Sequence, residues 1–148
     1  PNLLILGAGP DISPLLGMVE ALGWQASVSD HRQHYVDRLG PGVAECRPAA
    51  AVATEIDLGR FDAAIVMSHH LASDRSYLGA LAATDIPFVG LLGPPRRRER
   101  LLDELGDAAK GLGDRLRSPV GKKIGGRGPA AIALEIVAEL QAFFSARD

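Results

Sequence analysis

The N-terminal part of the chain contains glycines and an acidic residue whose spacing could bind a nucleotide. Gly7-Ala8-Gly9 follows the apolar, strand-like residues 3–6, and Asp30 follows a second strand-like run, residues 25–29, at the usual distance of about 20 residues. Such a turn lets the backbone approach a phosphate, which the N-terminus of the next helix holds through free N–H groups. The acid stands where a ribose hydroxyl is bound. This order predicts a Rossmann-type nucleotide site.

Three residues leave alternatives to this nucleotide-binding prediction. Ile12 occupies the place of the third glycine of the full fingerprint, which normally allows close helix–strand packing, and this weakens the dinucleotide interpretation. Arg32 could bind a phosphate, but a solvated loop arginine fits the pattern equally well. Asp30 could instead cap the turn that follows it. The sequence leaves these alternatives open.

A second polar group, Ser68-His69-His70, follows the apolar residues 61–67. Adjacent histidines could bind a metal or transfer protons near neutral pH. Neighbouring side chains of an extended chain point to opposite sides, so both rarely bind one ion. We therefore predict no metal site, but a ligand-facing His69 with Asp74 nearby. No Ser-His-Asp order, paired carboxylates or P-loop indicates a catalytic residue.

A run of arginines is a candidate anion site. Gly93 follows the apolar residues 87–92, and Arg96-Arg97-Arg98 comes soon afterwards. Most charge runs are solvated helix faces, and nearby acids offset this one. Of these arginines, we expect only Arg96, at the helix start, to lie near the strand end. Cys46 fits a small buried hydrophobic residue better than a nucleophile.

Strand and helix patterns alternate along the chain, which favours an α/β fold of three layers: a mostly parallel sheet with helices on both faces. Ligands of such sheets bind at the carboxyl ends of the strands, so we expect the segments that follow four of the strands to form one crevice. The expected strands are residues 3–6, 25–29, 43–46, 61–67 and 87–92. The expected helices are residues 13–22, 73–84 (capped by Ser73 or Asp74), 96–105 and 128–145, with a looser stretch at 106–117.

Composition narrows the class of protein. The 148 residues predict one domain, residues 1–148, which could also be part of a longer chain. A net charge of -2 offers no field for nucleic acid or an anionic membrane surface. No apolar run approaches the roughly 20 residues of a membrane helix, and no signal peptide is visible. The single cysteine excludes an internal disulfide. We therefore expect a cytoplasmic protein.

Several motifs together resemble the C-terminal Rossmann domain of the XdhC/CoxI family, the maturation factors of xanthine and carbon monoxide dehydrogenases. The most specific is Ser118-Pro119-Val120-Gly121 with Ile124-Gly125, followed by a final helix. The resemblance also rests on the glycine turn, Leu22-Gly23-Trp24, Asp30-His31-Arg32, Met67-Ser68-His69-His70 with Asp74, Val89-Gly90-Leu91-Leu92-Gly93, and Pro129-Ala130-Ala131-Ile132-Ala133-Leu134.

The resemblance implies a chaperone that holds the molybdenum cofactor (molybdopterin), promotes its sulfuration by a cysteine desulfurase, and delivers it to a molybdenum hydroxylase apo-enzyme. A homodimer is the assembly we consider. The chain departs from common family patterns at Pro10-Asp11-Ile12, Pro94-Pro95 and Lys122-Lys123. The predicted cofactor-binding residues are Gly7, Ala8, Gly9, Asp30, Arg32, Ser68, His69, Asp74, Gly93, Arg96, Gly121 and Gly125.

The function best predicted by the sequence is therefore that of a non-catalytic accessory protein that binds molybdenum cofactor, or a related pterin or nucleotide. One alternative is an NAD(P)-binding oxidoreductase domain. Another is a nucleotide-sensing or interaction module, in which the fold presents a surface to a partner.

Overall fold

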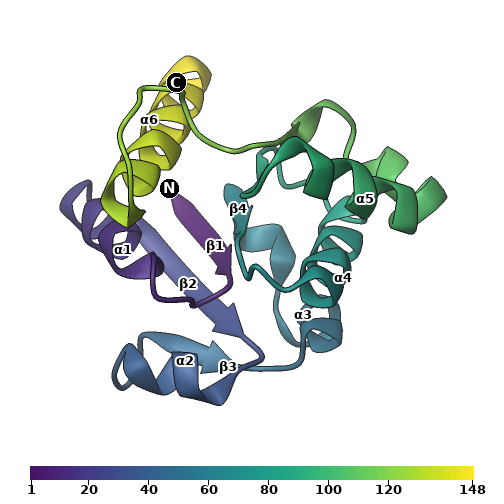
Figure 1. Cartoon of the computed structure of the whole chain (residues 1–148), viewed down its shortest axis with the longest axis horizontal. Helices are drawn as coiled ribbons and strands as arrows, with labels where there is room; N and C mark the ends of the chain where they lie inside the picture. Colours follow the sequence, from purple (N-terminus) through teal and green to yellow (C-terminus); the bar gives the residue numbers. More distant parts are fainter.

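A parallel sheet forms the centre of the molecule, as the computed structural model of residues 1–148 shows (Figure 1). The six strands lie in the order β3-β2-β1-β4-β5-β6, and every neighbouring pair is parallel. The chain therefore winds outward from β1 in one direction and then from β4 in the other. The strands are β1 (Asn2–Leu6), β2 (Gln25–Asp30), β3 (Ala44–Cys46), β4 (Ala63–Val66), β5 (Val89–Leu91) and β6 (Leu116–Arg117).

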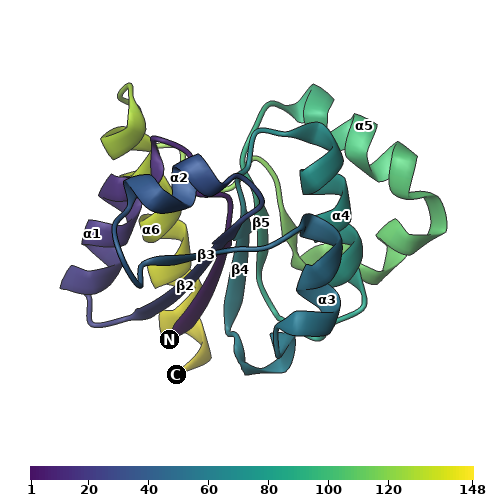
Figure 2. The same ribbon diagram turned by 90° about the horizontal axis from the view of Figure 1, so that it is seen from below.

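Helices cover both faces of this sheet, so the predicted α/β class and three-layer arrangement are confirmed (Figures 1 and 2). Connections between parallel strands must cross the sheet, and helices are their usual form. The helices are α1 (Ile12–Ala21), α2 (Gln33–Arg38), α3 (Val52–Glu55), α4 (Leu71–Ala82), α5 (Pro95–Leu105) and α6 (Pro129–Arg147).

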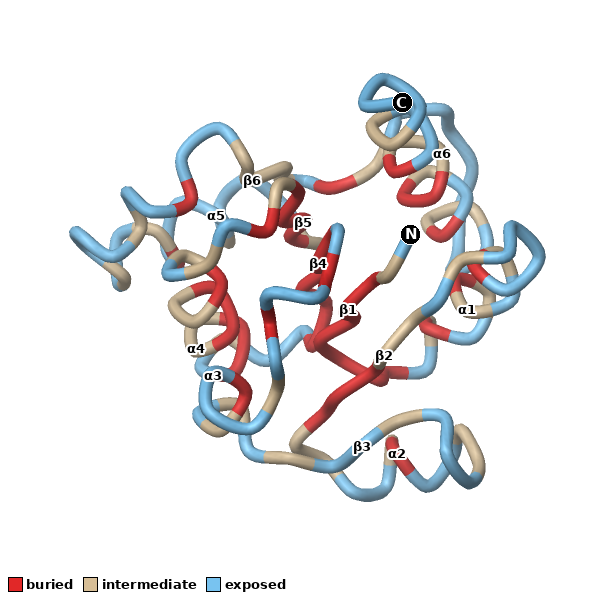
Figure 3. The backbone as a smooth tube through the Cα atoms, turned by 180° about the vertical axis from the view of Figure 1, so that it is seen from behind, coloured by how far each residue is buried: buried red, intermediate tan, exposed pale blue.

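Alternate residues of the central strands divide the core into two layers. Leu3 and Ile5 of β1 face α1 and α6, where they meet Ile12 and Ile136. Leu4 and Leu6 face the opposite layer, to which α4 contributes Tyr77, Leu78 and Leu81 and α5 contributes Leu101. Because β1 and β4 are covered on both sides, their residues from Leu3 to Leu6 and from Ala63 to Val66 are continuously apolar and fully buried, as the red parts of the central strands in Figure 3 show.

The register of the strands sets the position of the predicted site. Leu6, the last residue of β1, pairs with Ser29 of β2 and with Val66 of β4. The residues that follow these three strands therefore leave the sheet at the same edge, beside the point where the strand order reverses. That point is where doubly wound sheets bind their ligands.

Some elements differ from the sequence prediction. The two-residue strand β6 lies in the stretch 106–117, which we expected to be looser. The sequence did not predict this strand, because two residues are too few to show an alternating pattern. Helix α4 begins at Leu71, and its cap is His70 rather than Ser73 or Asp74. The His70 imidazole Nδ1 accepts the Ser73 N–H at 3.2 Å, so a histidine satisfies the helix terminus that we expected a hydroxyl or carboxylate to satisfy.

Helix α6 also corrects an expectation about apolar segments. Its 19 residues, with a mean hydropathy of 1.4, are long and apolar enough to cross a membrane by length and composition alone. In the structure, α6 packs against α1 and contributes Ala133, Ile136, Val137 and Leu140 to the core. This packing explains part of its apolar character, since 22% of the apolar stretch is buried.

Candidate functional site

The glycine turn after β1 is held against the end of β4. Gly7 has φ +128°, and a Cβ added to it would lie 2.6 Å from the carbonyl carbon of Met67 and from the Ser68 nitrogen. Its N–H donates to the Ser29 carbonyl at 2.9 Å. Only glycine allows this backbone approach, so Gly7 joins the ends of β1, β2 and β4.

Asp30 lies beneath the turn and is fully buried. Its Oδ2 accepts the Ala8 N–H at 2.7 Å, and its Oδ1 accepts the Arg32 N–H at 2.8 Å. The Arg32 guanidinium donates to both oxygens at 2.9 Å. Burial opposes the charged form, but these hydrogen bonds outweigh it and hold the pKa of Asp30 below its ordinary value. Asp30 is therefore already engaged where the sequence led us to expect a ribose contact.

Arg32 is a tether between strands in this arrangement. Besides Asp30, its guanidinium donates to the Ser68 carbonyl at 2.9 Å and lies 4.4 Å from the ring centre of Tyr35. The Asp30 carboxylate raises the pKa of Arg32. The sequence left open whether Arg32 binds a phosphate or is a solvated loop arginine. The contacts favour neither alternative, because protein groups occupy the guanidinium.

A second buried carboxylate, Asp74 in the first turn of α4, fixes the end of β4. It accepts from the Ser68 N–H at 3.2 Å and also from the Ser68 hydroxyl. Arg97 of α5 donates to its other oxygen at 2.9 Å. The structure thus brings Ser68 and Asp74 together, as the prediction of a common site requires.

The arginine that reaches this carboxylate is Arg97, not the expected Arg96. Arg96 is exposed on α5, whereas the Arg97 side chain passes over Gly93. A Cβ on Gly93, which has φ +134°, would lie 2.9 Å from the Arg97 Cδ. The missing side chain of Gly93 therefore makes room for the Arg97–Asp74 ion pair.

Asp11 and His69 form a pair at the N-terminus of α1. His69 Nε2 lies 3.2 Å from Asp11 Oδ2, and His69 has φ +60°, which is uncommon for a residue other than glycine. The other carboxylate oxygen, Asp11 Oδ1, is buried without a hydrogen-bond partner, although Asp11 is the cap residue of α1. It would lie 3.3 Å from a Cβ on Gly9, and so stands over the turn.

The turn offers few free donors to an anion. The N–H groups of Gly7 and Ala8 are bonded as described, the Ile12 N–H donates to the Gly9 carbonyl at 3.1 Å, and Pro10 has no N–H, which leaves the Gly9 and Asp11 N–H groups without a hydrogen bond. A phosphate placed at this helix terminus would also meet the Asp11 carboxylate. Part of the phosphate-binding capacity of such a turn is therefore used within the protein, and the Asp11 carboxylate opposes an anion at the donors that remain.

Two further histidines border this region. Ser73 Oγ lies 2.9 Å from His70 Nδ1 and 3.2 Å from His31 Nδ1, and the two imidazole rings are 5.0 Å apart. Because His70 Nδ1 accepts the Ser73 N–H, the proton of neutral His70 resides on Nε2. Burial lowers the pKa of His31, and Arg32 and His70 add to this effect, while Asp30 opposes it.

Tyr77 of α4 completes the inner layer of the site. Its hydroxyl is fully buried and has no hydrogen-bond partner. Burial, followed by the charges of Asp30 and Asp74, raises the pKa of Tyr77 far above its ordinary value. The tyrosine is therefore neutral. No sequence signal indicated its role, because a tyrosine within a helical pattern is typical of the core.

We call residues 7–11, 30–32, 68–70 and 92–93, with Asp74 and Arg97, the strand-end cluster. The contacts above link all four strand-end segments, so their predicted convergence is present in the structure. Ala8, Asp30, Arg32, Ser68 and Asp74 serve mainly as its frame. The side chains at its surface are His31, His69, His70 and Asp11, of which the sequence prediction included only His69. No group of three His, Cys, Asp or Glu residues could hold a metal ion.

Gly121 and Gly125, the remaining predicted residues, contact α6 rather than the frame of the cluster. The Gly121 N–H donates to Glu139 Oε1 at 2.7 Å, and the Gly125 N–H lies 3.4 Å from Glu135 Oε2. A Cβ on Gly121 would lie 3.1 Å from the Glu135 Cβ. These glycines shape the loop that precedes α6.

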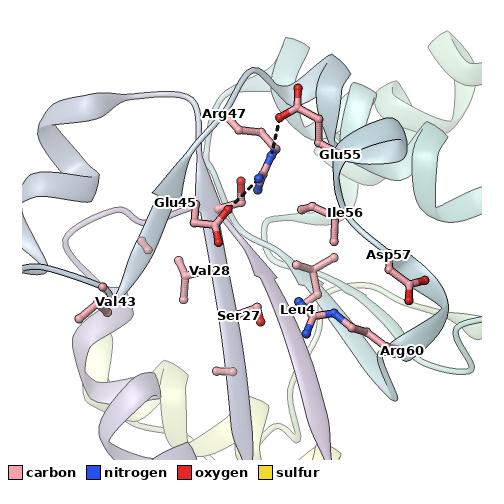
Figure 4. A pocket seen from close by; sticks show the side chains of 14 residues that line it. Leu4, Ser27, Val28, Val43, Glu45, Arg47, Glu55, Ile56, Asp57 and Arg60 are labelled. Atoms are coloured by element: carbon pink, nitrogen blue, oxygen red, sulfur yellow. Dashed lines mark hydrogen bonds and ion pairs between the residues drawn. The ribbon is translucent and has the colours of Figure 1, made fainter.

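A separate cavity of about 410 Å³ lies against β2 and β3, on the side of α3 (Figure 4). Arg47 crosses its rim and pairs with Glu45 at 2.7 Å and with Glu55 at 3.2 Å. Ser29 Oγ faces this region without a hydrogen-bond partner.

Cys46, at the end of β3, is exposed, which corrects the expectation of a buried residue.

Comparison with known proteins gives concordant results. Residues 3–140 match the family described as the XdhC Rossmann domain. The chain is 34% identical over 143 residues to a Bacillus subtilis protein named as a probable xanthine dehydrogenase component, and 29% identical over 150 residues to the uncharacterized Escherichia coli protein YqeB. It spans 42% and 27% of these two relatives.

A solved structure agrees with these relatives. A Bacillus halodurans protein, described as a xanthine dehydrogenase, superimposes with a TM-score of 0.87 at 29% identity. The match covers 99% of this chain and 43% of that protein. The fold described above is therefore shared along the whole chain.

Proposed function

Because this chain belongs to the XdhC family, whose Rossmann domain it forms, we propose that it serves in the maturation of a xanthine dehydrogenase-type molybdoenzyme by binding the molybdenum cofactor at the strand-end cluster. Two similar proteins bear the name xanthine dehydrogenase, which supports an association with that class of enzyme. The apo-enzyme and a cysteine desulfurase are the partners that this proposal includes.

The observation that favours a pterin over a dinucleotide is the unpartnered Oδ1 of Asp11. A buried carboxylate oxygen without a donor is costly, and a ligand that supplies a donor removes this cost. With its aminopyrimidinone edge at the turn, a pterin presents N–H donors to this oxygen, and the phosphate of molybdopterin would lie away from it. A dinucleotide places its pyrophosphate at such a turn and presents only negative oxygens there. The pterin is thus the better complement to a turn that already contains a carboxylate.

The remaining surface groups fit such a ligand as well. His69, paired with Asp11, and the two imidazoles of His31 and His70 border the strand ends and are accessible in part. The frame beneath them is rigid, because two buried carboxylate–arginine pairs fix it. When bound, the cofactor supplies the molybdenum and sulfur chemistry, while the chain's own residues bind and orient the pterin.

An NAD(P)-dependent oxidoreductase domain is the rival that the strand order supports. Its ribose contact would need Asp30, whose carboxylate already accepts four hydrogen bonds. Its pyrophosphate would lack the Gly7 and Ala8 donors, which the turn uses elsewhere, and would meet the Asp11 carboxylate. Both arguments favour the pterin.

Isothermal titration of the purified chain with molybdopterin, NAD+ and NADP+ tests the proposal. We expect binding of molybdopterin and thermal stabilisation that grows with ligand concentration as RT ln(1 + [L]/Kd). Binding of NAD+ or NADP+ but not molybdopterin, together with turnover of NAD(P)H on aldehyde or alcohol substrates, would establish the oxidoreductase instead.

A further inference from the structure

The loop that precedes α6 concentrates positive charge on a protein that is acidic overall. Residues 121–128 include Lys122, Lys123 and Arg127, all exposed, and none of the three forms an ion pair. The whole chain has a formal net charge of -2. The positive charge is therefore a local feature. We call residues 121–128 the cationic loop.

The acids nearest to the cationic loop are engaged with its backbone. Glu135 Oε2 accepts the Ile124 N–H at 2.8 Å, and Glu139 Oε1 accepts the Gly121 N–H at 2.7 Å. The Lys122 N–H donates to the Glu135 carbonyl at 2.9 Å. These bonds hold the loop in one shape and leave its ammonium and guanidinium groups free for another molecule.

An apolar side chain lies among these cations. Ile124 is 58% exposed, the largest fraction for any large hydrophobic residue of the chain, and Leu134 on α6 is 50% exposed. Leu134 precedes Glu135, which holds the loop. Protein interfaces commonly bury an apolar anchor at the centre and place charges at the rim. A site for a free phosphate would have no use for the apolar anchor.

The position of the cationic loop matches the strand-end cluster. In Figure 2 the loop projects beyond the beginning of α6, beside α1, at the edge of the sheet where β1 ends. Val120, directly before the loop, packs in the same core layer as Ala8 and Ile12. A molecule bound to the loop would therefore lie at the same edge of the sheet as a ligand at the glycine turn.

We propose that the cationic loop is the docking contact for an acidic surface of the molybdenum hydroxylase apo-enzyme, with Ile124 inserted into an apolar pocket of that enzyme. The proposal rests on the function proposed above. Complementary charge attracts and orients the enzyme, and the apolar anchor supplies most of the binding free energy.

The test measures binding of the chain to the purified, cofactor-free molybdenum hydroxylase of the same organism by biolayer interferometry. We expect Lys122→Glu/Lys123→Glu and, separately, Ile124→Ser to weaken binding by about tenfold or more. Raising the salt from about 50 to 300 mM should weaken wild-type binding but not the remaining binding of the charge-reversed variant. Arg98→Glu/Lys110→Glu, an equal charge change on the α5 side, is the matched control and should bind as wild type does.

Titration with molybdopterin separates the two proposals. Loop variants that keep wild-type affinity for molybdopterin but lose the enzyme support the docking contact. Loop variants that bind the enzyme as wild type does would overturn it, as would a wild-type chain that binds molybdopterin but not the enzyme. Loop-dependent binding to DNA or to anionic vesicles, with the enzyme unaffected, would also overturn it. A wild-type chain that binds neither molybdopterin nor the enzyme contradicts the proposed function itself.

Discussion

Arg32 folds back onto Asp30, two residues earlier in the chain, and its guanidinium donates to both oxygens of that buried carboxylate at 2.9 Å. The same carboxylate accepts the Ala8 N–H of the glycine turn. The acid that would contact a ribose in a dinucleotide-binding protein is here a support for the turn. Removing the Asp30 carboxylate should therefore destabilise the fold, and any effect on ligand binding should follow from that.

Arg32→Ala should reduce the free energy of unfolding by roughly 3–5 kcal/mol, because it leaves the Asp30 charge buried without its cationic partner. Urea unfolding followed by circular dichroism measures this change. Arg98→Ala, at an exposed position without an ion pair, is the control and should stay within about 0.5 kcal/mol of wild type. A similar small effect for Arg32→Ala would mean that the carboxylate is not buried in solution.

The stability of the protein should also fall in acid through Asp30. The pKa of this carboxyl is lowered in the folded state, so its contribution is fully present above the unfolded-state value of about 3.9 and is lost as the pH falls through the lower folded value. Unfolding by urea between about pH 2 and pH 6 measures this loss. The loss should be smaller in Asp30→Asn, which has no charge to neutralise, and parallel curves would contradict the assignment.

The two glycines of the turn should differ sharply. Gly7→Ala places a methyl group 2.6 Å from backbone atoms of Met67 and Ser68, directly after β4, at φ +128°, which should cost at least about 3 kcal/mol or prevent folding. In Gly9→Ala the new methyl group would meet only Asp11 Oδ1, at 3.3 Å, so this variant should fold. Thermal unfolding of both proteins compares them directly. Equal stability would place the turn in a different conformation.

The sequence predicted the fold and the convergence of the segments that follow the strands, because both depend on local patterns. The apolar strands, the Gly7 turn and the segments after each strand all follow from residue type and spacing. The role of Asp30 could not be predicted, because it depends on whether a nearby arginine turns toward it. The choice of Arg97 over Arg96 likewise depends on the space left by Gly93, a tertiary contact that spacing does not describe.

Asp11 shows a different limit. Pro10-Asp11 reads as an ordinary helix start, and the position of the carboxylate over Gly9 becomes visible only in the structure. His69 could be selected from the sequence as a ligand-facing residue, but its pairing with Asp11 joins positions 58 residues apart. Contacts of this kind decide the chemistry of the site.

The last prediction concerns what Asp11 selects. Asp11→Asn keeps the shape of the side chain but removes its charge, so the turn no longer repels a phosphate and no longer offers two acceptor oxygens to N–H donors. Affinity for molybdopterin should fall by at least about tenfold, or 1.4 kcal/mol, while affinity for ADP-ribose, a dinucleotide fragment, should stay equal or rise.

Calorimetric titration of both ligands measures the two changes, and Asp103→Asn, at an exposed site on α5, is the matched control. The opposite directions matter, because a merely structural defect would weaken both ligands together. A folded Asp11→Asn protein with wild-type affinity for molybdopterin would show that the pterin binds away from the turn.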